Sequence, residues 1–409
     1  MADEIRMTEL VPEWPGQTHI WMWREATELR KLGVEISFTS TRPPCDADAA
    51  KHEFIHDPLA TTSYLWPTRV TDSINCVLWA ALHAPRSTVS ALVRVLSLPL
   101  EGNRRLVRAA GAFLLGCKLA KQLSERKVRF LHVQSLANCA VIALVAHKLT
   151  GVPYCIVVNA NLDWWGGAVA EKLRDASFVV THAKWIREEL LERFAWLKPE
   201  KVVLAPVGVD TAAWCPAPES KLTGARFKLL SVGRLHPSKG HSVVIEAVDI
   251  LRSRGVDVHL SIVGDGPDRT LLASLILAKG LQDHVCLMLT QSGGSVLRLL
   301  QQSDAFVLAS KAEPLGVVYM EAMAAGLPTI GTNAGGVTEI ITDGKTGLLV
   351  APDDPNAVAA SVQRLIESPS LATQLGAAGR TFIQANFDSA MGAKKLESAI
   401  RRAVNGHEQ

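Results

Sequence analysis

The sequence lacks any uninterrupted apolar stretch that approaches the ~18 residues needed to cross a bilayer. Its first residues, MADEIR, are charged and do not form the apolar segment of a secretory signal. It also lacks internal repeats and low-complexity segments. These absences argue against an integral membrane protein, a secreted protein and a repeat protein, and we expect a globular protein of the cytoplasm.

Cysteine is scarce and irregularly placed. It occurs seven times, an odd number, and no two cysteines form a C-x-x-C pair. A disulfide framework needs paired cysteines, and structural zinc sites usually draw on closely spaced ones. We therefore expect a reduced, cytosolic chain without a zinc site.

Charge of one sign is not in excess either, because the net charge of the whole chain is only +3. Such a balance gives no global field for nucleic acid, so we expect no nucleic-acid partner. What the chain does have is 48% apolar and 20% charged residues over 409 positions. That composition is typical of a soluble globular protein, and the length exceeds what one hydrophobic core usually serves, so we expect two domains.

The most informative stretch is KAEPLGVVYMEAMAAGLP, residues 311–328. The apolar run 305–308 before it is typical of a buried parallel strand, and apolar residues at helical spacing follow Gly316. This pattern places Glu313 on the strand-to-helix loop and Glu321 about two turns into the helix. Unpaired N–H groups and the helix dipole near Gly316 would favour an anion, with a carboxylate on either side to bind hydroxyl groups. A nucleotide sugar presents its groups in this order, since its diphosphate lies between sugar and ribose hydroxyls.

The same string resembles the E-x7-E signature of the retaining glycosyltransferases of family 4, which have the GT-B fold. The resemblance implies that Glu313 is a catalytic residue that binds hydroxyls of the donor sugar, and that Glu321 binds the ribose. It also implies that the backbone of Leu315, Gly316 and Val317 lies against the sugar and the phosphates.

A second segment, GRLHPSKG (233–240), follows an expected strand at 227–232 and opens an expected helix at 242–254. A positive helix end, the fork of Arg234 and the point charge of Lys239 together suit a diphosphate, although an ordinary loop with two solvated cations is the alternative. The segment resembles the family's G-R-x4-K-G element. The resemblance implies that both cations are catalytic, because they would stabilise charge on the leaving diphosphate.

Three further positions are expected at the donor. Gly233 begins the segment just described, and Gly264 begins a GDGP turn that lacks the glycine spacing of a dinucleotide loop. Thr290 opens the loop after the expected strand 285–289, where members of the family hold the base largely through backbone groups. The glycine usual at that strand end is missing here. We assign Gly233, Gly264 and Thr290 to donor binding.

The first half opens with an expected strand, a loop that contains Gly16, and an expected helix at 17–32. This order is typical of a Rossmann-like domain. Gly16 is an acceptor-side candidate, and an ordinary turn glycine is an equally good reading.

A departure from the family pattern follows the expected strand 154–158. The loop there usually carries a histidine in an H-x-x-D-like string, thought to contact the donor sugar. In this chain Asn159 or Asn161 stands in its place. An amide can hydrogen-bond a sugar hydroxyl but cannot carry a proton charge, so these two asparagines are acceptor-side candidates only.

Residues 69–129 differ in character from the rest. They hold eleven basic and three acidic residues, an excess of eight positive charges, with apolar residues between them. Such basic amphipathic helices can lie in an anionic lipid interface, and solvated helix faces packed on a sheet are the alternative. All ten tryptophans lie between Trp14 and Trp214, which suits sugar stacking or a membrane interface as well as core packing. If the segment meets a membrane, the expected contacts are Arg86, Arg94, Arg104, Arg105 and Arg108, with Trp79 and Leu92 nearby.

Strands alternate with helices in both halves, so the expected fold class is α/β, with two Rossmann-like, doubly wound domains that face each other across a cleft in the GT-B manner. We place the first domain at 1–215, a linker rich in Pro, Ser and Gly at 216–225, and the nucleotide-sugar-binding domain at 226–388. A final helix at about 389–405 is expected to pack back on the first domain. Residues 344–350 are expected to form a hairpin-like edge.

The predicted function is transfer of a sugar from a UDP- or GDP-sugar, with retention of configuration, to a lipid, lipid-linked or saccharide acceptor. No cofactor and no metal are expected, because two cations already serve the diphosphate. The one D-x-D pair, Asp46 and Asp48, lies in an apparent loop. Two alternatives stay open: a phosphorylase or epimerase on the same scaffold, and a non-catalytic protein that binds nucleotide sugars.

Overall fold

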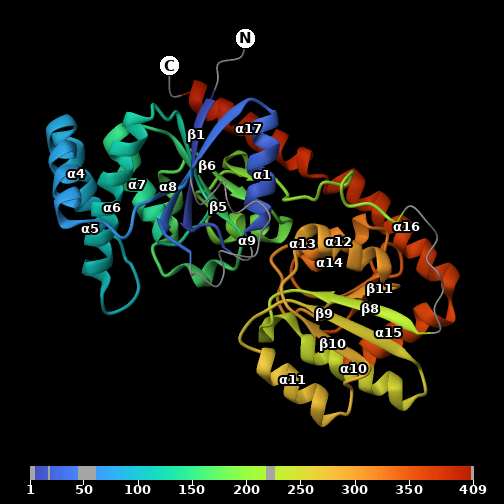
Figure 1. Cartoon of the computed structure of the whole chain (residues 1–409). Helices are drawn as coiled ribbons and strands as arrows, with labels where there is room; N and C mark the ends of the chain where they lie inside the picture. The colour runs from blue at the N-terminus through green and yellow to red at the C-terminus, as the bar shows by residue number, and fades with distance from the viewer. Residues whose placement is uncertain (1–4, 17–18, 45–60, 218–225, 407–409) are drawn as a thin grey trace. The chain divides into compact units, whose positions relative to one another are not determined.

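The computed structural model describes residues 5–16, 19–44, 61–217 and 226–406. The chain divides into two compact units (Figure 1). The first unit comprises residues 1–206 and 392–409, and the second comprises residues 207–391. The first unit is therefore discontinuous in sequence, and it contains most of the final helix.

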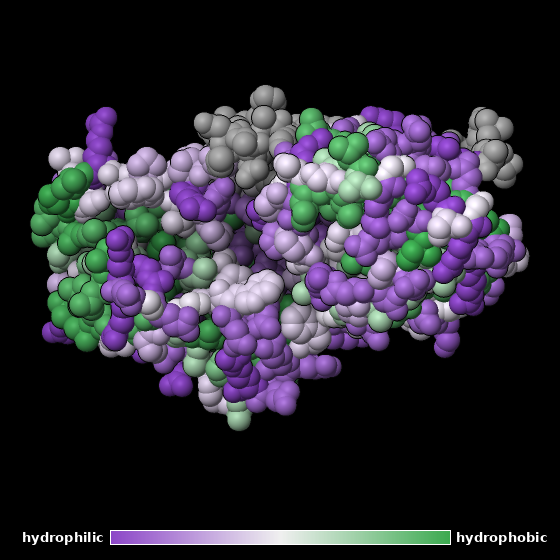
Figure 2. All heavy atoms as spheres, turned by 90° about the horizontal axis from the view of Figure 1, so that it is seen from below, coloured by the Kyte–Doolittle hydropathy of each residue, from purple (hydrophilic) through white to green (hydrophobic). Residues whose placement is uncertain are grey.

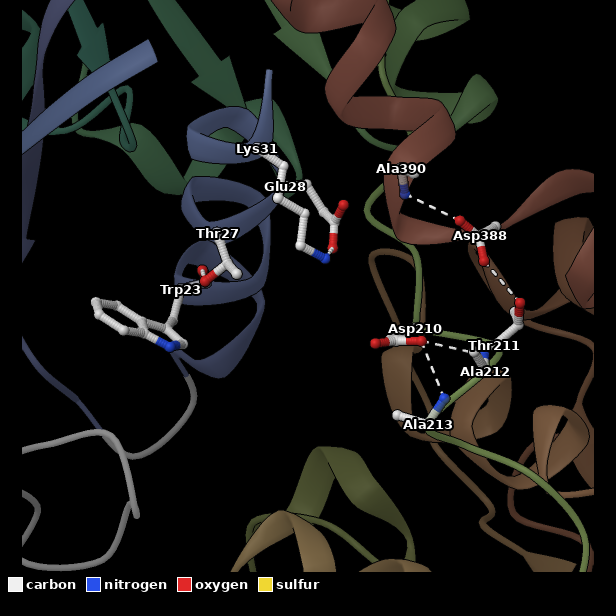
Figure 3. A network of polar contacts seen from close by, with 10 residues as sticks. All are labelled: Trp23, Thr27, Glu28, Lys31, Asp210, Thr211, Ala212, Ala213, Asp388 and Ala390. Atoms are coloured by element: carbon white, nitrogen blue, oxygen red, sulfur yellow. Dashed lines mark hydrogen bonds and ion pairs between the residues drawn. The ribbon is translucent and has the colours of Figure 1, made fainter. Parts of the chain in front are cut away.

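The second unit begins before the linker expected at 216–225, because residues 207–217 pack within it. Val209 N donates to Phe387 O (3.0 Å), and Ser389 N donates back to Val209 O (3.0 Å). In the same contact Thr211 Oγ1 donates to Asp388 Oδ2 at 2.6 Å (Figure 3). These bonds join both ends of the second unit, so the chain enters and leaves it at neighbouring points.

The first unit contains a seven-stranded parallel sheet in the order β3-β2-β1-β4-β5-β6-β7. Its central strands are runs of buried residues, as expected for a parallel sheet that is covered on both faces. The strands are β1 (Ile5–Glu13), β2 (Val34–Arg42), β3 (Ser63–Tyr64), β4 (Phe130–Val133), β5 (Tyr154–Val158), β6 (Phe178–Thr181) and β7 (Val202–Leu204).

Helices cover both faces of this sheet (Figure 1). Leu29 and Leu396 share a buried apolar cluster with strand residues such as Met7, so helices α1 and α17 pack on one face. Helix α7 is buried almost all round, and α6 crosses it so closely that a Cβ on Gly116 would lie 2.4 Å from Val145 Cβ. The helices are α1 (Ile20–Lys31), α4 (Val70–His83), α5 (Pro85–Ser97), α6 (Arg105–Glu125), α7 (Asn138–Thr150), α8 (Val169–Arg174), α9 (Lys184–Arg193) and α17 (Ser389–Asn405).

The second unit contains a six-stranded parallel sheet in the order β10-β9-β8-β11-β12-β13. Its strands are β8 (Phe227–Val232), β9 (Val258–Val263), β10 (Val285–Met288), β11 (Ala305–Val307), β12 (Thr329–Thr332) and β13 (Leu348–Val350). Its helices are α10 (His241–Ser253), α11 (Arg269–Ala278), α12 (Gly293–Gln302), α13 (Val317–Ala324), α14 (Val337–Ile340), α15 (Pro355–Glu367) and α16 (Pro369–Asn386).

The hairpin-like edge expected at 344–350 was wrong. Strand β13 pairs with β12 in parallel, with Ile330 opposite Leu348, so residues 337–347 make a crossover rather than a tight hairpin. Across the described parts of both units, no helix combines the length and the apolar character needed to cross a membrane.

Helix α17 should contribute to the stability of the first unit. Leu396 is fully buried against the first sheet, so Leu396→Ala should lower the free energy of unfolding by about 2–5 kcal/mol through lost apolar burial and a cavity. Denaturant unfolding measures the loss, and hydrogen exchange should locate it in β1, β2 and β4. Lys395→Ala on the exposed side of the helix is the control. A loss confined to the strands of the second unit would contradict this packing.

Candidate active site

The second sheet reverses its strand order between β8 and β11. These two strands are hydrogen-bonded neighbours, with Leu229 opposite Ala305, while β9 and β10 continue to one side and β12 and β13 to the other. In an open α/β sheet, loops diverge at such a reversal and ligands bind outside the carboxyl ends of the strands. A ligand site is therefore expected at the loops after β8 and β11.

These two loops touch through their backbones. Gly240 has φ +65°, and a Cβ at this position would lie 1.9 Å from the carbonyl oxygen of Ala309, so no other residue fits. Lys311 N also donates to Ser238 O (2.8 Å). The sequence elements GRLHPSKG and KAEPLG, 70 to 80 residues apart along the chain, are thus held side by side.

The contact brings Lys239 and Glu313 together. Lys239 Nζ donates to Glu313 Oε2 at 2.6 Å, and Ser310 Oγ donates to the same oxygen at 3.2 Å. Glu313 is buried and Lys239 is partly exposed. The backbone of Glu313 is fixed as well, because Gly336 N donates to Glu313 O (2.8 Å). The pair is thus an oriented carboxylate beside a cation that faces partly into solvent.

Helix α13 begins at this loop. Gly316, at φ +93°, precedes its first residue, and the ring of Tyr319 fills the space where a Cβ on Gly316 would lie. Leu315 is buried and Val317 is partly exposed. Glu321, the fifth residue of α13, lies about one turn into the helix and not two as expected, because the helix starts only after Gly316.

A second backbone contact accounts for the glycines at 233 and 264, which were assigned to donor binding. A Cβ on Gly264 would lie 1.9 Å from Gly233 O, so the turns after β8 and β9 pack against each other. Arg234, between these turns, is exposed, and no described residue pairs with its guanidinium. Thr290 follows β10, two strands away from β8, so it is not part of the Lys239–Glu313 contact.

Two residues that support this site were not predicted from the sequence. Ser310 orients Glu313, as described above. His241, at the start of α10, is buried beneath the loop that carries Lys239, with Nδ1 3.2 Å from Ser231 Oγ. Burial, aided by the Lys239 charge, lowers the pKa of His241 to about 4, so the ring is neutral at physiological pH. The signal available in the sequence was a polar residue that follows an apolar strand.

The first unit offers three sequence-predicted positions. Gly16 lies after β1, where a Cβ would meet the ring of His19 at 2.7 Å. Asn159 directly follows β5 and is half-buried. Asn161 Oδ1 accepts a hydrogen bond from Asp163 N (2.9 Å), so its oxygen caps a short turn at 162–165. Of the two asparagines, Asn159 therefore has the freer carbonyl oxygen.

Among the described residues, one group of side chains has metal-ligand chemistry: Glu9, Glu25 and His132, with ligand atoms within 4.8 Å of one another. However, Gln134 Nε2 donates to both carboxylates, at 2.9 and 3.1 Å. Amide hydrogens aimed at the oxygens suit a network that holds protons better than a cation site. Asp46 and Asp48 lie outside the described residues.

Known proteins resemble this chain in sequence. The family model described as "Glycosyl transferases group 1" matches residues 217–382. Glycogen synthase of Mycobacterium tuberculosis is 30% identical over 290 residues, which cover 65% of this chain and 68% of that protein.

The chain belongs to the group 1 glycosyl transferases.

Other relatives extend the comparison. A GDP-mannose-dependent alpha-(1-6)-phosphatidylinositol monomannoside mannosyltransferase of Mycolicibacterium smegmatis is 32% identical over 196 residues, 44% of this chain and 51% of that one. A glycosyltransferase of Rickettsia africae superposes with a TM-score of 0.72 at 17% identity, over 98% of this chain and 99% of that one. Anabaena HepE in complex with UDP superposes with a TM-score of 0.72 at 14% identity, over 97% of this chain and 100% of that one. This group 1 glycosyl transferase thus has the GT-B fold, as the sequence predicted.

Gly240 allows a matched test of the loop contact in this group 1 glycosyl transferase. Gly240→Ala and Gly255→Ala both place a side chain at positive φ (+65° and +75°), which costs about 1–2 kcal/mol, but only the former meets a backbone atom. Gly240→Ala should therefore lower the free energy of unfolding by about 1–3 kcal/mol more than Gly255→Ala, as overpacking does. Denaturant titration of both variants measures the difference. Equal losses would mean that the loops can separate freely.

Proposed function

We propose that this chain transfers a sugar from a UDP- or GDP-sugar, with retention of configuration, to a lipid, lipid-linked or saccharide acceptor. The observation that carries the proposal is the Lys239–Glu313 pair at the strand-order reversal of the second sheet. It joins a cation suited to a diphosphate with a carboxylate suited to sugar hydroxyls, and the exposed Arg234, whose guanidinium pairs with no residue in the described part of the chain, lies on the same loop as Lys239.

In the proposed mechanism, Lys239 and Arg234 bind the diphosphate of the donor. Glu313 then accepts hydrogen bonds from hydroxyls of the donor sugar, while Ser310 keeps its carboxylate in place. The backbone from Leu315 to Val317 lies along the sugar and the phosphates. As the bond to the sugar breaks, negative charge grows on the leaving diphosphate, and the two cations stabilise it more than they stabilise the bound donor.

The relatives support the classes of donor and acceptor. The mycobacterial relatives are named as a glycogen synthase and a GDP-mannose-dependent enzyme acting on a phosphatidylinositol mannoside. Anabaena HepE was solved with UDP and glucose. These names include glycogen, a GDP-mannose donor with a glycolipid acceptor, and UDP with glucose, and from them we infer a nucleotide-sugar donor and a saccharide or lipid-linked acceptor for this chain.

Turnover decides between the enzyme and a non-catalytic binding protein, an alternative that the asparagines at 159 and 161 keep open. The experiment incubates the purified chain with a panel of UDP- and GDP-sugars and measures both release of free nucleotide and thermal stabilisation. We expect slow hydrolysis of one donor, abolished in Lys239→Ala. Stabilisation by a donor without any turnover, with or without added saccharides and lipids, would indicate the binding protein.

The affinity for the nucleotide should depend on Glu321. If its carboxylate binds the ribose, Glu321→Ala should weaken UDP or GDP binding by about 1–3 kcal/mol, the scale of a hydrogen bond to a charged group. Calorimetry measures the affinity, and Glu367→Ala on the exposed side of α15 is the control. An unchanged affinity in a folded Glu321→Ala protein counts against the assignment.

Catalysis should need no divalent metal, because Arg234, Lys239 and the start of α13 already provide positive charge for the diphosphate. Donor turnover should therefore persist in EDTA at the rate seen without it. Loss of turnover in chelator that Mn²⁺ or Mg²⁺ restores would instead return Asp46 and Asp48 to consideration.

The acceptor side carries a surface that suits a lipid interface. Four apolar residues of α4 recur every fourth position on its exposed face, Val70, Ile74, Leu78 and Leu82, and they are 54–80% exposed. Figure 2 shows hydrophobic side chains gathered at the left, over the α4–α6 part of the first unit. Contiguous exposed apolar area of this kind marks interaction sites. Further exposed apolar residues on α5 and α6 are Val89, Leu92, Val93, Leu96, Leu106, Val107 and Leu114.

Arginines surround this surface. Arg86, Arg104 and Arg105 are exposed, and Arg105 Nη2 donates to Leu96 O at the end of α5 (2.9 Å). Arg94 and Arg108 are half-buried, and Arg94 lies 3.9 Å from Asp175, so these two predicted contacts are less available than the other three arginines. We propose that α4–α6 bind an anionic membrane peripherally, where a lipid-linked acceptor would be found.

Binding to vesicles should need negative lipid charge and should weaken with salt. Each basic residue at an anionic surface contributes about 1 kcal/mol, and the screening length falls from ~10 Å at 0.1 M to ~3 Å at 1 M salt. Sedimentation with phosphatidylglycerol and with phosphatidylcholine vesicles tests this, with Arg86→Glu/Arg104→Glu as the weakened variant. Equal, negligible binding to both vesicles at low salt would favour a soluble acceptor and leave the donor assignment standing.

A further inference from the structure

The first sheet also reverses its strand order, between β1 and β4. The loop after β1 contains Trp14 and Gly16 and enters α1 at Ile20. By the same topological rule, this loop borders the place where the first unit would bind a ligand. The sheet before this loop has a buried polar pair: Glu9 of β1 and His132, the one polar residue of β4, are register partners.

A single amide joins the two arms of this loop. Glu9 lies on the strand before the loop and Glu25 on the helix after it. Gln134, the residue that follows β4, donates through Nε2 to Glu9 Oε2 (2.9 Å) and to Glu25 Oε1 (3.1 Å). His132 Nδ1 lies 3.1 Å from Glu9 Oε1 and 3.8 Å from Glu25 Oε1. All four side chains are at most 7% exposed.

Two ionised carboxylates this close together in a buried site repel each other. They need two positive charges, supplied by protons or by a cation, to balance them. Burial disfavours the charged form of His132, but Glu9 and Cys155 together outweigh it and raise the pKa of the imidazole well above its ordinary value, so His132 supplies one charge. Burial raises the pKa of Glu25 to about 7; His132 opposes this shift and Glu9 adds to it. A proton on Glu25 therefore supplies the second. Besides these groups, the ionisable side chains that face the network are Arg30 of α1, Cys155 of β5 and His182 after β6.

A divalent cation could replace both protons, but the amide argues against it. Gln134 turns its N–H groups toward the carboxylates, although its Oε1 then has no hydrogen-bond partner among the described residues. A cation between the carboxylates would favour the opposite orientation, with Oε1 turned inward as a ligand. Protons account for the observed orientation.

We propose that Gln134 and the protonated Glu25 are positioning residues, which clamp β1 and α1 together and so fix both ends of the acceptor-side loop, at Gly16 and at His19. With Glu25 protonated, the clamp is closed and electrically balanced. When Glu25 loses its proton, two carboxylates repel each other in a buried site, and α1 separates from β1 more readily. That this loop receives the acceptor rests on the proposed function; the clamp itself does not.

The sign of the pH dependence follows from this arrangement. Glu25 is protonated up to about pH 7 when buried, and only up to its ordinary value of 4.5 once opening exposes it. Between these values the open form is the one that releases a proton, so opening becomes more favourable by roughly tenfold per pH unit. Above about pH 7 the contribution of Glu25 levels off, and His132 adds none because it keeps its partner Glu9 on the neighbouring strand in both forms.

Hydrogen exchange of the full chain, measured by mass spectrometry from pH 5 to 8 and corrected for the intrinsic exchange rate, tests the clamp. Peptides that cover residues 10–26 should lose protection by roughly tenfold per pH unit up to pH 7. Glu25→Gln keeps an acceptor for Gln134 but cannot ionise, so protection should become independent of pH. Gln134→Leu should lower protection at every pH. Glu28→Gln, which alters the Glu28–Lys31 pair on the same helix (2.7 Å; Figure 3), should behave as the wild type.

Activity adds a second readout. With whichever donor the wild type hydrolyses, turnover should decline as pH rises from 5 to about 7, and Glu25→Gln should remove this decline and leave the affinity for UDP or GDP unchanged. If Glu25→Gln keeps the wild-type pH dependence of exchange, or if Zn²⁺ restores protection that a chelator has removed, the proton clamp is overturned. Absence of turnover with every donor would defeat the proposed function only, because the exchange result is independent of it.

Discussion

The close approach of Gly240 to the carbonyl of Ala309 is the constraint on which the donor side depends. Parallel strands end at one edge of the sheet, but this alone places loops only near each other. Contact between the two backbones, which a glycine at 240 permits, brings Lys239 within hydrogen-bond distance of Glu313. The loop from Ser310 to Gly316 is in turn held by Gly336 and Tyr319. Charge placement thus follows from how closely main chains can pack.

Both units place a carboxylate and a cation at the point where strand order reverses, but they use the pair differently. In the second unit the pair lies on loops, and Lys239 is partly exposed, so a donor can compete for it. In the first unit Glu9 and His132 lie within strands and are fully buried, so no ligand can reach them. The same topology therefore carries the proposed donor site in one unit and the proposed internal clamp in the other.

Much of this could be predicted because the signals were local. The strands at 130–133, 154–158 and 227–232 coincide with short, mainly apolar segments, and the helix at 355–367 begins at a proline after a capping aspartate. Motif spacing and family resemblance singled out Lys239 and Glu313 separately, whereas their direct ion pair was not predicted.

What failed depended on partners distant in sequence. Helix α16 was missed because it contains Gly376 and Gly379, which weaken a helical pattern; both are needed where the helix meets the backbone of Gly326 and Thr346. The parallel pairing of β13 depends on β12 rather than on its own turn. The network around Gln134 joins Glu9, Glu25 and His132 from three elements, and each residue alone looked like an ordinary polar position.

Because the first unit is discontinuous in sequence, its last segment is synthesised only after the whole second unit. Ala393, Leu396 and Ile400 complete an apolar cluster that begins with Ile5 and Met7, and the whole second unit lies between them in sequence. While the chain emerges from the ribosome, the second unit has all its residues available before α17 exists. The first unit meanwhile exposes the apolar face that α17 later covers. A nascent chain stalled before residue 392 would therefore present a finished second unit and an incomplete first one to chaperones.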